Sequence, residues 1–427
     1  MNPRVIARLQ LDGAAGQSEI PLPSNGNRPS GDVLTFSRPL TVLVAVPTLD
    51  TGAADTGAID LVRILSHGGH HVIVASRGGR LEGDIAAAGG EFIRLDVASQ
   101  NPARMLKGAI ALKRLTRERR CDVIHAHGRS AAWSAYLAAR WCGVPLLTTW
   151  YKGFREQNVL KRLYNGVMAR GERVIAVSDQ IADLIVERYP LPAGRIAVLP
   201  AAIDLARFDP TAVAAERLDA IRRTWGVTPD TKVILVVGRM LRRKGHHVAV
   251  KAVHRLKERG LKDFVCVFAG EDQGHTHYTG ELWDLVSATA TTDVIRLAGA
   301  VEDMPAAYAA ATVVVSAAVQ PEGLQRAILE AQAMARPVVI SDLAAGPEVV
   351  LAPPAVPEER MTGLRVPAGD DAALAAAVIR LFSLTDTARS AIGARGREWV
   401  ATQFDPASIA RATLALYADV ARTRRSR

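Results

Sequence analysis

Short apolar, β-branched segments recur along the chain, each separated from the next by a longer amphipathic or polar stretch. Continuous apolar segments are typical of strands buried in a parallel sheet, and the amphipathic stretches are typical of helices that cover its faces. In the first half of the chain the predicted strands are 41–47, 72–75, 123–124, 146–149 and 174–177. In the second half they are 232–237, 264–269, 294–297, 312–315 and 337–340.

The alternation of strands and helices pauses near Pro200 and restarts at residue 232, after a charged helical connector at 216–225. Two such series predict an α/β protein with two Rossmann-like domains facing a cleft, with ligands at the carboxyl ends of the strands. A chain of 427 residues is long enough for two domains of ordinary size. The predicted domains are residues 39–210 and 211–403, after a disordered N-terminal tail at residues 1–38.

Composition narrows the class of protein only moderately. The three cysteines lack Cys-x-x-Cys spacing, so neither a zinc site nor a disulfide framework is predicted, and a reducing cytoplasm is expected. No stretch approaches the roughly 18 apolar residues of a membrane span, and the N-terminus shows no secretory apolar region. The formal net charge of +10 favours anionic partners, which include a nucleotide, a membrane surface and nucleic acid.

Two carboxylates, Glu322 and Glu330, lie eight residues apart in the segment 320–341. If residues 323–330 are helical, Glu322 stands at the mouth of the helix and Glu330 lies roughly 12 Å further along its axis, at about 1.5 Å per residue. This separation is comparable to that between the sugar and the ribose of a nucleotide sugar. An amphipathic helix with two surface glutamates explains the spacing equally well.

A basic loop, Gly-Arg-Met-Leu-Arg-Arg-Lys-Gly, follows the predicted strand 232–237 and precedes a helix. Cationic side chains at this edge of a sheet can neutralise a diphosphate leaving group. The order of residues is not that of a Walker A loop. The cations of this loop are Arg239, Arg242, Arg243 and Lys244.

A pair of histidines, His125 and His127, follows the predicted strand 123–124, and alternation places both on the same side. No nearby carboxylate completes a metal-ligand set, and the chain contains no Asp-x-Asp motif. We therefore predict no metal site and no cofactor, and expect the cationic loop alone to supply positive charge.

Several separated motifs resemble those of the family 4 glycosyltransferases, especially bacterial members assigned to lipopolysaccharide core and other surface-glycan synthesis. The resemblance covers roughly residues 40–420. Its motifs are the Glu-x7-Glu pair, Gly238-Arg239 with Lys244-Gly245, and the segments 122–127, 174–178, 199–205 with Phe208, and 362–369.

The resemblance implies a GT-B fold, with a C-terminal helix at 404–422 joining the first domain, and transfer with retention of anomeric configuration. It implies catalytic roles for Glu322, Arg239 and Lys244. The same residues are expected to bind the donor together with Gly52, Gly323, Leu324, Gln325 and Glu330. By the same resemblance Arg239 and Lys244 are the diphosphate ligands, and Arg242 and Arg243 are interpreted as surface charge. His127 and Tyr151 are weaker candidates for contact with the acceptor or the transferred sugar.

Three positions depart from the family pattern. Thr148-Thr149 is followed by Trp150 and Tyr151, where many relatives have a histidine two residues after the pair. Gly52 is followed by alanine instead of a second glycine, and Leu324-Gln325 replaces a common Phe-Gly. The role of the missing histidine is therefore open at Tyr151.

We expect a metal-independent, cytoplasmic glycosyltransferase that moves a sugar from a nucleotide diphosphate donor to a glycan or lipid-linked acceptor in cell-envelope synthesis. No nucleic-acid partner is expected. A nucleotide-sugar epimerase or phosphorylase of the same fold, or an inactive basic binding protein, remains an alternative. The nucleotide, sugar, acceptor, linkage and oligomeric state stay open.

The segment 104–118 is basic and amphipathic. Leu106, Ala109, Ile110 and Leu112 are predicted to face a core. Its cations are Arg104, Lys107, Lys113, Arg114 and Arg117. Such a helix can lie against the anionic inner face of the cytoplasmic membrane, although a solvated helix face has the same pattern.

Overall fold

The computed structural model describes residues 38–50, 52–153, 158–192, 194–272, 274 and 276–425. The predicted N-terminal tail, apart from Arg38, lies outside these residues. The described chain forms two compact units. Unit 1 consists of residues up to 177, 181–200 and 407 onward, and unit 2 consists of 178–180 and 201–406.

Unit 1 is built on a parallel sheet that contains seven strands within the described residues. In spatial order these are β3 (Glu91–Arg94), β2 (His71–Ser76), β1 (Thr41–Ala45), β4 (Val123–His127), β5 (Leu146–Trp150), β6 (Arg173–Ala176) and β7 (Ile196–Val198). The interior strands β1, β4 and β5 are almost entirely buried, as their apolar, β-branched sequences predict.

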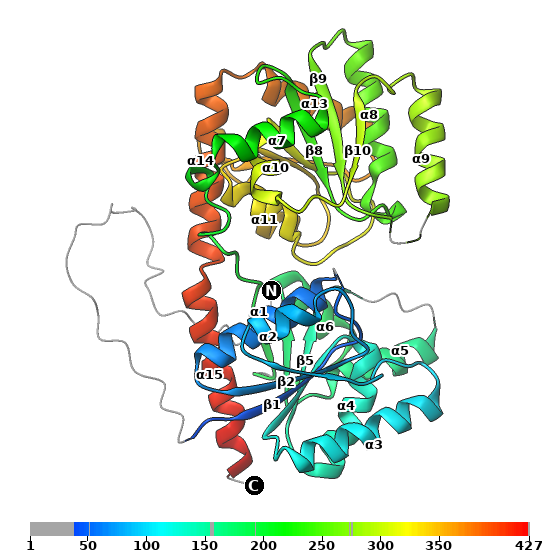
Figure 1. Cartoon of the computed structure of the whole chain (residues 1–427), viewed down its shortest axis with the longest axis vertical. Helices are drawn as coiled ribbons and strands as arrows, with labels where there is room; N and C mark the ends of the chain where they lie inside the picture. The colour runs from blue at the N-terminus through cyan, green and yellow to red at the C-terminus, as the bar shows by residue number, and fades with distance from the viewer. Residues whose placement is uncertain are drawn as a thin grey trace, which may run out of the picture. The chain divides into compact units, whose positions relative to one another are not determined.

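Helices cover both faces of this sheet (Figure 1). They are α1 (Ala53–His67), α2 (Glu82–Ala87), α3 (Pro102–Glu118), α4 (Arg129–Cys142), α5 (Val159–Asn165), η1 (Gly166–Ala169), α6 (Asp179–Arg188) and α15 (Pro406–Arg425). The C-terminal helix α15 packs in unit 1, where Leu416, Tyr417 and Val420 join the core formed by α1 and the sheet.

Unit 2 is built on a second parallel sheet, with six strands within the described residues. In spatial order they are β10 (Ile295–Gly299), β9 (Phe264–Ala269), β8 (Lys232–Val237), β11 (Val313–Ser316), β12 (Val338–Ser341) and β13 (Gly363–Val366). Two parallel sheets with helical layers confirm the predicted α/β fold class.

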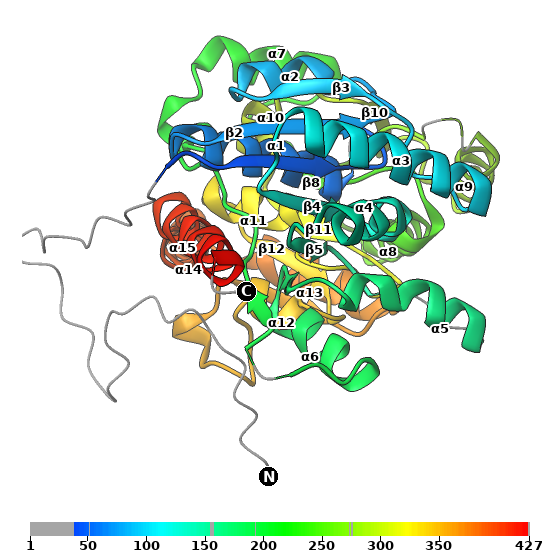
Figure 2. The same ribbon diagram turned by 90° about the horizontal axis from the view of Figure 1, so that it is seen from below.

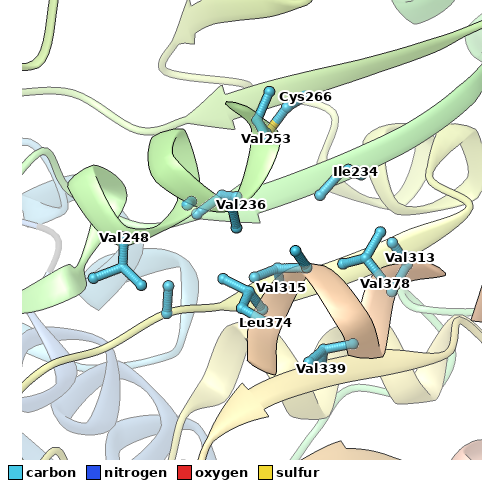
Figure 3. Packing of buried hydrophobic residues seen from close by; sticks show 14 of the residues in the cluster. Ile234, Val236, Val248, Val253, Cys266, Val313, Val315, Val339, Leu374 and Val378 are labelled. Atoms are coloured by element: carbon cyan, nitrogen blue, oxygen red, sulfur yellow. The ribbon is translucent and has the colours of Figure 1, made fainter. Parts of the chain in front are cut away.

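The helices of unit 2 also lie on both faces of its sheet. They are η2 (Pro210–Ala212), α7 (Ala215–Trp225), η3 (Arg242–Lys244), α8 (His246–Glu258), α9 (Thr276–Ala288), α10 (Met304–Ala310), α11 (Arg326–Ala333), α12 (Gly346–Val349), η4 (Glu358–Arg360), α13 (Asp371–Ser383) and α14 (Asp386–Gln403). Figure 3 shows Val236 and Val315 of the sheet packed near Val248 of α8 and Leu374 of α13. This core holds the strand ends, and hence the loops that follow them, in fixed positions.

Each sheet has a point at which the chain reverses its direction of growth. In unit 1 the strands grow from β1 outward to β3 and then resume at β4, on the other side of β1. In unit 2 they grow from β8 outward to β10 and resume at β11. Ligands of open α/β sheets bind outside the carboxyl ends of the strands at such switch points. A ligand-binding site in unit 2 is therefore expected at the loops after β8 and β11.

Candidate functional site

Glu322 lies in the loop that follows β11, and two cations from η3 contact it. Lys244 Nζ is 2.7 Å from Glu322 Oε2, and Arg243 Nη1 donates to the opposite oxygen, Oε1. The Glu322 side chain is only 10% exposed. The interpretation of Arg243 as surface charge is therefore wrong, because its guanidinium pairs with the largely buried carboxylate of Glu322. Arg242, by contrast, is exposed and pairs with Glu281.

The loops after β8 and β11 are held against each other by their backbones. Val319 N donates to Arg243 O at 2.9 Å. Gly245 has a positive φ of 73°, and a Cβ at this position would lie 1.7 Å from Ala317 O. Only glycine fits this approach, so the sequence Lys244-Gly245 fixes where the lysine stands relative to Glu322.

Arg239 and Lys244 both belong to the turn after β8. Gly238 directly follows the strand, and its N–H donates to Ala269 O at 2.9 Å. The Lys244 side chain folds back over Gly238. A Cβ built at Gly238 would lie 3.4 Å from Lys244 Cε. Arg239 follows Gly238 directly and is partly buried. The predicted diphosphate ligands thus stand at the carboxyl end of the first strand of unit 2.

The helix that carries Glu330 begins later than predicted. Residues 323–325 form a loop, and α11 starts at Arg326 with Gln325 as its N-cap. Glu322 is therefore not at the mouth of a helix, and the axial distance expected from residues 323–330 does not apply. Gly323 within the segment favours the loop, and the backbone contact of Val319 with Arg243 holds the β11 loop at its start.

Glu330 is held in place through both carboxylate oxygens. Tyr308 OH donates to Oε2 at 3.0 Å, and Arg326 Nε donates to Oε1 at 3.1 Å. The side chain is 15% exposed, and burial raises the pKa of Glu330, against the lowering by Arg326 and Tyr308. A carboxylate accepts about four hydrogen bonds, so this anchored group retains capacity for two hydroxyl donors.

Three further predicted donor ligands, Gly323, Leu324 and Gln325, form the loop between these two glutamates. Gly323 and Gln325 are buried, and Leu324 is partly buried. Within the described part of the chain, Gln325 Oε1 is buried and has no hydrogen-bond partner. A buried carbonyl oxygen without a hydrogen-bond donor is energetically unfavourable.

In unit 1, His127 and Tyr151 are in direct contact. Tyr151 Oη is 2.9 Å from His127 Nδ1, and that nitrogen is 3.2 Å from Ala54 O. Because a carbonyl oxygen only accepts, Nδ1 carries the proton and Nε2 is the acceptor. Among the described residues nothing bonds Nε2, and burial lowers the pKa of His127 to about 4. The ring is thus neutral, with its buried Nε2 as the acceptor nitrogen.

The neighbouring His125 is bonded on both sides. Its Nδ1 is 2.7 Å from Tyr417 Oη of α15, and its Nε2 is 2.7 Å from Thr149 Oγ1. Burial, and secondarily the nearby His127, lowers the pKa of His125 well below its usual range. The two rings are 4.6 Å apart, so the alternation predicted for the pair is confirmed, and His125 has a structural partner.

Gly52 is the N-cap of α1, and its backbone shapes the loop after β1. The amides of Gly52 and Asp50 donate to Asp55 Oδ2, at 2.9 and 3.1 Å. Burial raises the pKa of Asp55, against the lowering by these amides. Gly52 lies at the switch point of unit 1, whereas the other predicted donor ligands lie in unit 2.

Within the described residues, no group of three or more His, Cys, Asp or Glu side chains could hold a metal ion. The sequence reasoning missed Arg243, Tyr308 and Arg326 as neighbours of the glutamates. Arg326 was detectable, because it lies four residues before Glu330 on the same helix face. Tyr308 comes from α10, and no local pattern indicates that contact.

Two family models match the chain, one largely in each unit. The model described as Glycosyltransferase Family 4 matches residues 54–207, and the model described as Glycosyl transferases group 1 matches residues 231–384. Two Rossmann-like units with this site define the class of GT-B glycosyltransferases. The chain belongs to the family 4-like glycosyltransferases, as the sequence resemblance predicts.

Individual proteins support this assignment. The chain is 28% identical over 313 residues to D-inositol 3-phosphate glycosyltransferase of Salinispora arenicola, covering 66% of this chain and 65% of that protein. A crystal structure of a glycosyltransferase from Rickettsia africae has a TM-score of 0.79 and 28% identity, covering 90% of this chain and 98% of that chain. Anabaena HepE in complex with UDP-glucose shares the fold, with a TM-score of 0.77, 18% identity, and coverage of 89% of this chain and 100% of that chain. The chain spans less than two thirds of the length of curated relatives such as those of Nocardiopsis dassonvillei and S. arenicola, at 44% and 65%.

Proposed function

We propose that the protein transfers a sugar from a nucleoside diphosphate sugar to a hydroxyl of a glycan or lipid-linked acceptor. The observation that carries this proposal is the arrangement of charge on either side of the β8–β11 switch point. A lysine and arginines stand after β8, and two anchored carboxylates stand in the segment after β11. This arrangement supplies cations for a diphosphate and acceptors for sugar and ribose hydroxyls.

In the proposed reaction, the bond between the anomeric carbon and the diphosphate oxygen breaks, and the acceptor oxygen bonds to the same carbon. Arg239 and Lys244 stabilise the charge that develops on the departing diphosphate. Glu322 accepts hydrogen bonds from donor-sugar hydroxyls, and Glu330 accepts them from the ribose. The acceptor oxygen bonds on the face from which the diphosphate departs, which gives retention. Its proton passes to an oxygen of the leaving diphosphate, so no separate protein base is needed.

The nucleotide and the acceptor define the finer part of the proposal. Because Anabaena HepE is seen with UDP-glucose, UDP-sugars are the first donors to test. Because the S. arenicola relative is named for inositol 3-phosphate, that acceptor is tested beside lipid-linked and lipopolysaccharide core glycans, which the sequence resemblance favours. We infer that the acceptor lies against unit 1 near Tyr151, whose hydroxyl contacts the neutral ring of His127.

We also propose that unit 1 attaches to an anionic membrane surface from the cytoplasmic side. No helix among the described residues has the length and apolar character needed to cross a bilayer. Helices α3, α4 and α5 lie side by side in both views (Figures 1 and 2), joined by the bonds Ser134 Oγ to Met105 O and Trp133 Nε1 to Tyr164 O. They carry six of the seven large hydrophobic side chains that are exposed in the described part of the chain.

Helix α3 contributes to this surface differently from the prediction. Ala109 and Leu112 are buried as expected, but Leu106 and Ile110 are 47% and 56% exposed. They point outward on the same side of α3, four residues apart, on a helix that also carries the predicted cations. On α5, Val159, Leu160 and Leu163 are also exposed, with Leu160 at 77%. Apolar side chains among lysines and arginines suit the interface of an anionic membrane.

A screen tests the proposed function. Thermal unfolding is followed with UDP, GDP, ADP and their sugars, and nucleoside diphosphate release is then measured with the stabilising donor, with and without EDTA. We expect one donor to stabilise the protein by mass action. Release of the nucleoside diphosphate is expected to require an acceptor and to survive EDTA. The anomeric configuration of the product is expected to match that of the donor sugar.

The alternatives give different results in the same screen. A change in the donor sugar without any acceptor would identify an epimerase, and glycan cleavage that depends on phosphate would identify a phosphorylase. Absence of nucleotide release with every donor and acceptor would favour an inactive binding protein. Loss of activity on chelation, restored by magnesium or manganese, would contradict the metal-independent mechanism.

A further inference from the structure

Glu322 has two counter-ions from adjacent residues of η3, one on each oxygen. Lys244 Nζ contacts Oε2 at 2.7 Å, and Arg243 Nη1 contacts Oε1. The two cationic side chains are 25% and 29% exposed, so all three groups are largely withdrawn from water. One carboxylate with two cations leaves an excess positive charge in the cluster.

The proposed mechanism makes two demands on Lys244. It must stabilise the diphosphate, and it also neutralises Glu322. If Lys244 were the only partner, its movement to the phosphate would leave a largely buried carboxylate unpaired beside a dianion, which is strongly unfavourable. Arg243 removes this conflict, because its guanidinium remains on Glu322 when the lysine turns away.

The backbone supports this division of roles. Arg243 O accepts a hydrogen bond from Val319 N at 2.9 Å, so Arg243 is tied to the loop that carries Glu322. The Lys244 side chain lies over Gly238 at the end of β8, near Arg239. Arg242 in the same turn is directed to Glu281 and lies over the ring of Tyr278.

We propose that Arg243 is a positioning residue that acts through Glu322 and frees Lys244 for the diphosphate of the donor. This inference rests on the proposed function, since it assumes that a nucleoside diphosphate sugar occupies the site. Arg243 lies between the motifs Gly238-Arg239 and Lys244-Gly245 and belongs to neither. Arg243 holds Glu322 oriented toward the donor sugar, whereas Lys244 moves between two anions.

A double-mutant cycle tests this role. The variants are Arg243→Gln, Glu322→Gln and the double variant, and Arg242→Gln is the matched control because it removes one charge from the same turn. Calorimetry gives the Kd of UDP, GDP or ADP, whichever binds the wild type best, and initial rates give kcat and KM for its sugar. Arg243→Lys, which keeps the charge, serves as the rescue variant, and Arg243→Met replaces Arg243→Gln if that variant does not fold.

We expect Arg243→Gln to weaken nucleotide binding and to lower kcat, each by about tenfold or more, the scale for an interaction between charged neighbours. The loss is expected to shrink to about threefold or less in the Glu322→Gln background, because no carboxylate remains to be held. Arg242→Gln is expected to stay within about threefold of wild type, and Arg243→Lys to recover most of the loss.

Additive effects of Arg243→Gln and Glu322→Gln would overturn the inference, and so would an equal loss in Arg242→Gln, which would show a simple effect of net charge. In both cases wild-type binding and turnover would leave the proposed function standing. Failure of the wild type to bind any nucleoside diphosphate would overturn both together.

Discussion

Lys244 and Glu322 form an ion pair at 2.7 Å, with little exposure to solvent. Such a pair is preorganised, because the lysine is already at the end of β8 when an anion arrives. Its charge is also partly neutralised in advance, so donor binding exchanges one anionic partner for another. In this account Glu322 and the donor diphosphate therefore compete for Lys244.

Replacing Lys244 or Arg239 by alanine is expected to lower kcat/KM by about 100-fold or more, the scale for losing one preorganised group that stabilises charge in a transition state. The measurement is the initial rate of nucleoside diphosphate release. Arg242→Ala, an exposed neighbour, is the control and is expected to keep near-wild-type kinetics. Unchanged kinetics in a folded Lys244 variant would remove that residue from the site.

A second residue-scale prediction concerns acid stability. Burial lowers the pKa of His127 from 6.5 to about 4. Between these two pH values the imidazole is protonated in the unfolded chain and neutral in the folded protein. Stability present above pH 6.5 is therefore lost as the pH falls toward 4, by up to roughly 3 kcal/mol from this group. His127→Gln is expected to lose less Tm than wild type between pH 6.5 and 5, compared with its own value at pH 7.5. An identical loss in variant and wild type would show that His127 does not titrate in this way.

Sequence reasoning named Glu322, Glu330, Arg239 and Lys244 because each stands in a motif with fixed local spacing. It assigned Arg243 wrongly, because a run of three cations does not show which one turns toward a carboxylate 79 residues away. The same limit applies to Tyr308, which reaches Glu330 across 22 residues. Contacts between elements depend on the fold and leave no periodic trace in the sequence.

At the scale of elements, the site depends on the close approach of the loops after β8 and β11. Gly245 permits this approach, because a Cβ there would lie 1.7 Å from Ala317 O. Gly260 also has a positive φ, but a Cβ there would meet nothing within 4 Å. An alanine at Gly260 would therefore cause backbone strain alone, whereas an alanine at Gly245 would cause the same strain and also a steric clash between the loops.

Gly245→Ala is expected to lower the free energy of unfolding by clearly more than the roughly 1 kcal/mol typical of alanine at a strained glycine position. It is also expected to weaken nucleotide binding, since it displaces Lys244 and Glu322. Gly260→Ala is the control and is expected to lose stability without loss of binding. Denaturant unfolding and nucleotide titration measure both; equal effects of the two variants would contradict the steric explanation.

Most strands were predictable, and those that were missed lie at sheet edges. The interior strands β8 and β9 are continuous apolar segments, and their predicted bounds match the structure. The strands β3, β7 and β13 are short edge strands. An edge strand is covered on fewer sides, so its sequence need not be apolar; Glu91 and Arg94 of β3 are exposed.

At the scale of the whole molecule, the exposed apolar side chains of unit 1 predict binding to anionic vesicles. Leu160→Ser with Leu163→Ser is expected to weaken binding at least about tenfold, since burial of each leucine contributes about 1.5–3 kcal/mol. Binding is also expected to weaken as salt rises, because four of the five cations of α3 are exposed. Vesicle flotation measures both effects.

The control for this experiment is Trp283→Ser, at a 40% exposed hydrophobic position of α9 in unit 2. It is expected to bind vesicles like wild type. Binding that is insensitive to salt, or an equal loss in the control, would argue against attachment through α3, α4 and α5.

The fold class and the family could be inferred from the sequence because strand periodicity and several separated motifs extend over most of the chain. The acceptor could not, because Tyr151, one of the two candidates of unit 1 for its contact, stands at a position that departs from the family pattern. Tyr151 contacts His127 directly at 2.9 Å, a contact that the sequence alone does not indicate.

The central claim is that the carboxylates after β11 hold a nucleoside diphosphate sugar, and steady-state kinetics of Glu330→Gln test it most directly. The substitution keeps the size of the side chain and removes its charge, and hydrogen bonds to a charged group contribute about 1.5–3 kcal/mol each. The donor KM is therefore expected to rise at least about tenfold, with kcat little changed and the fold intact. Glu322→Gln, closer to the departing sugar, is expected to lower kcat more than it raises KM. If both variants bind and turn over the donor like wild type, the assignment of these glutamates to the donor site is contradicted.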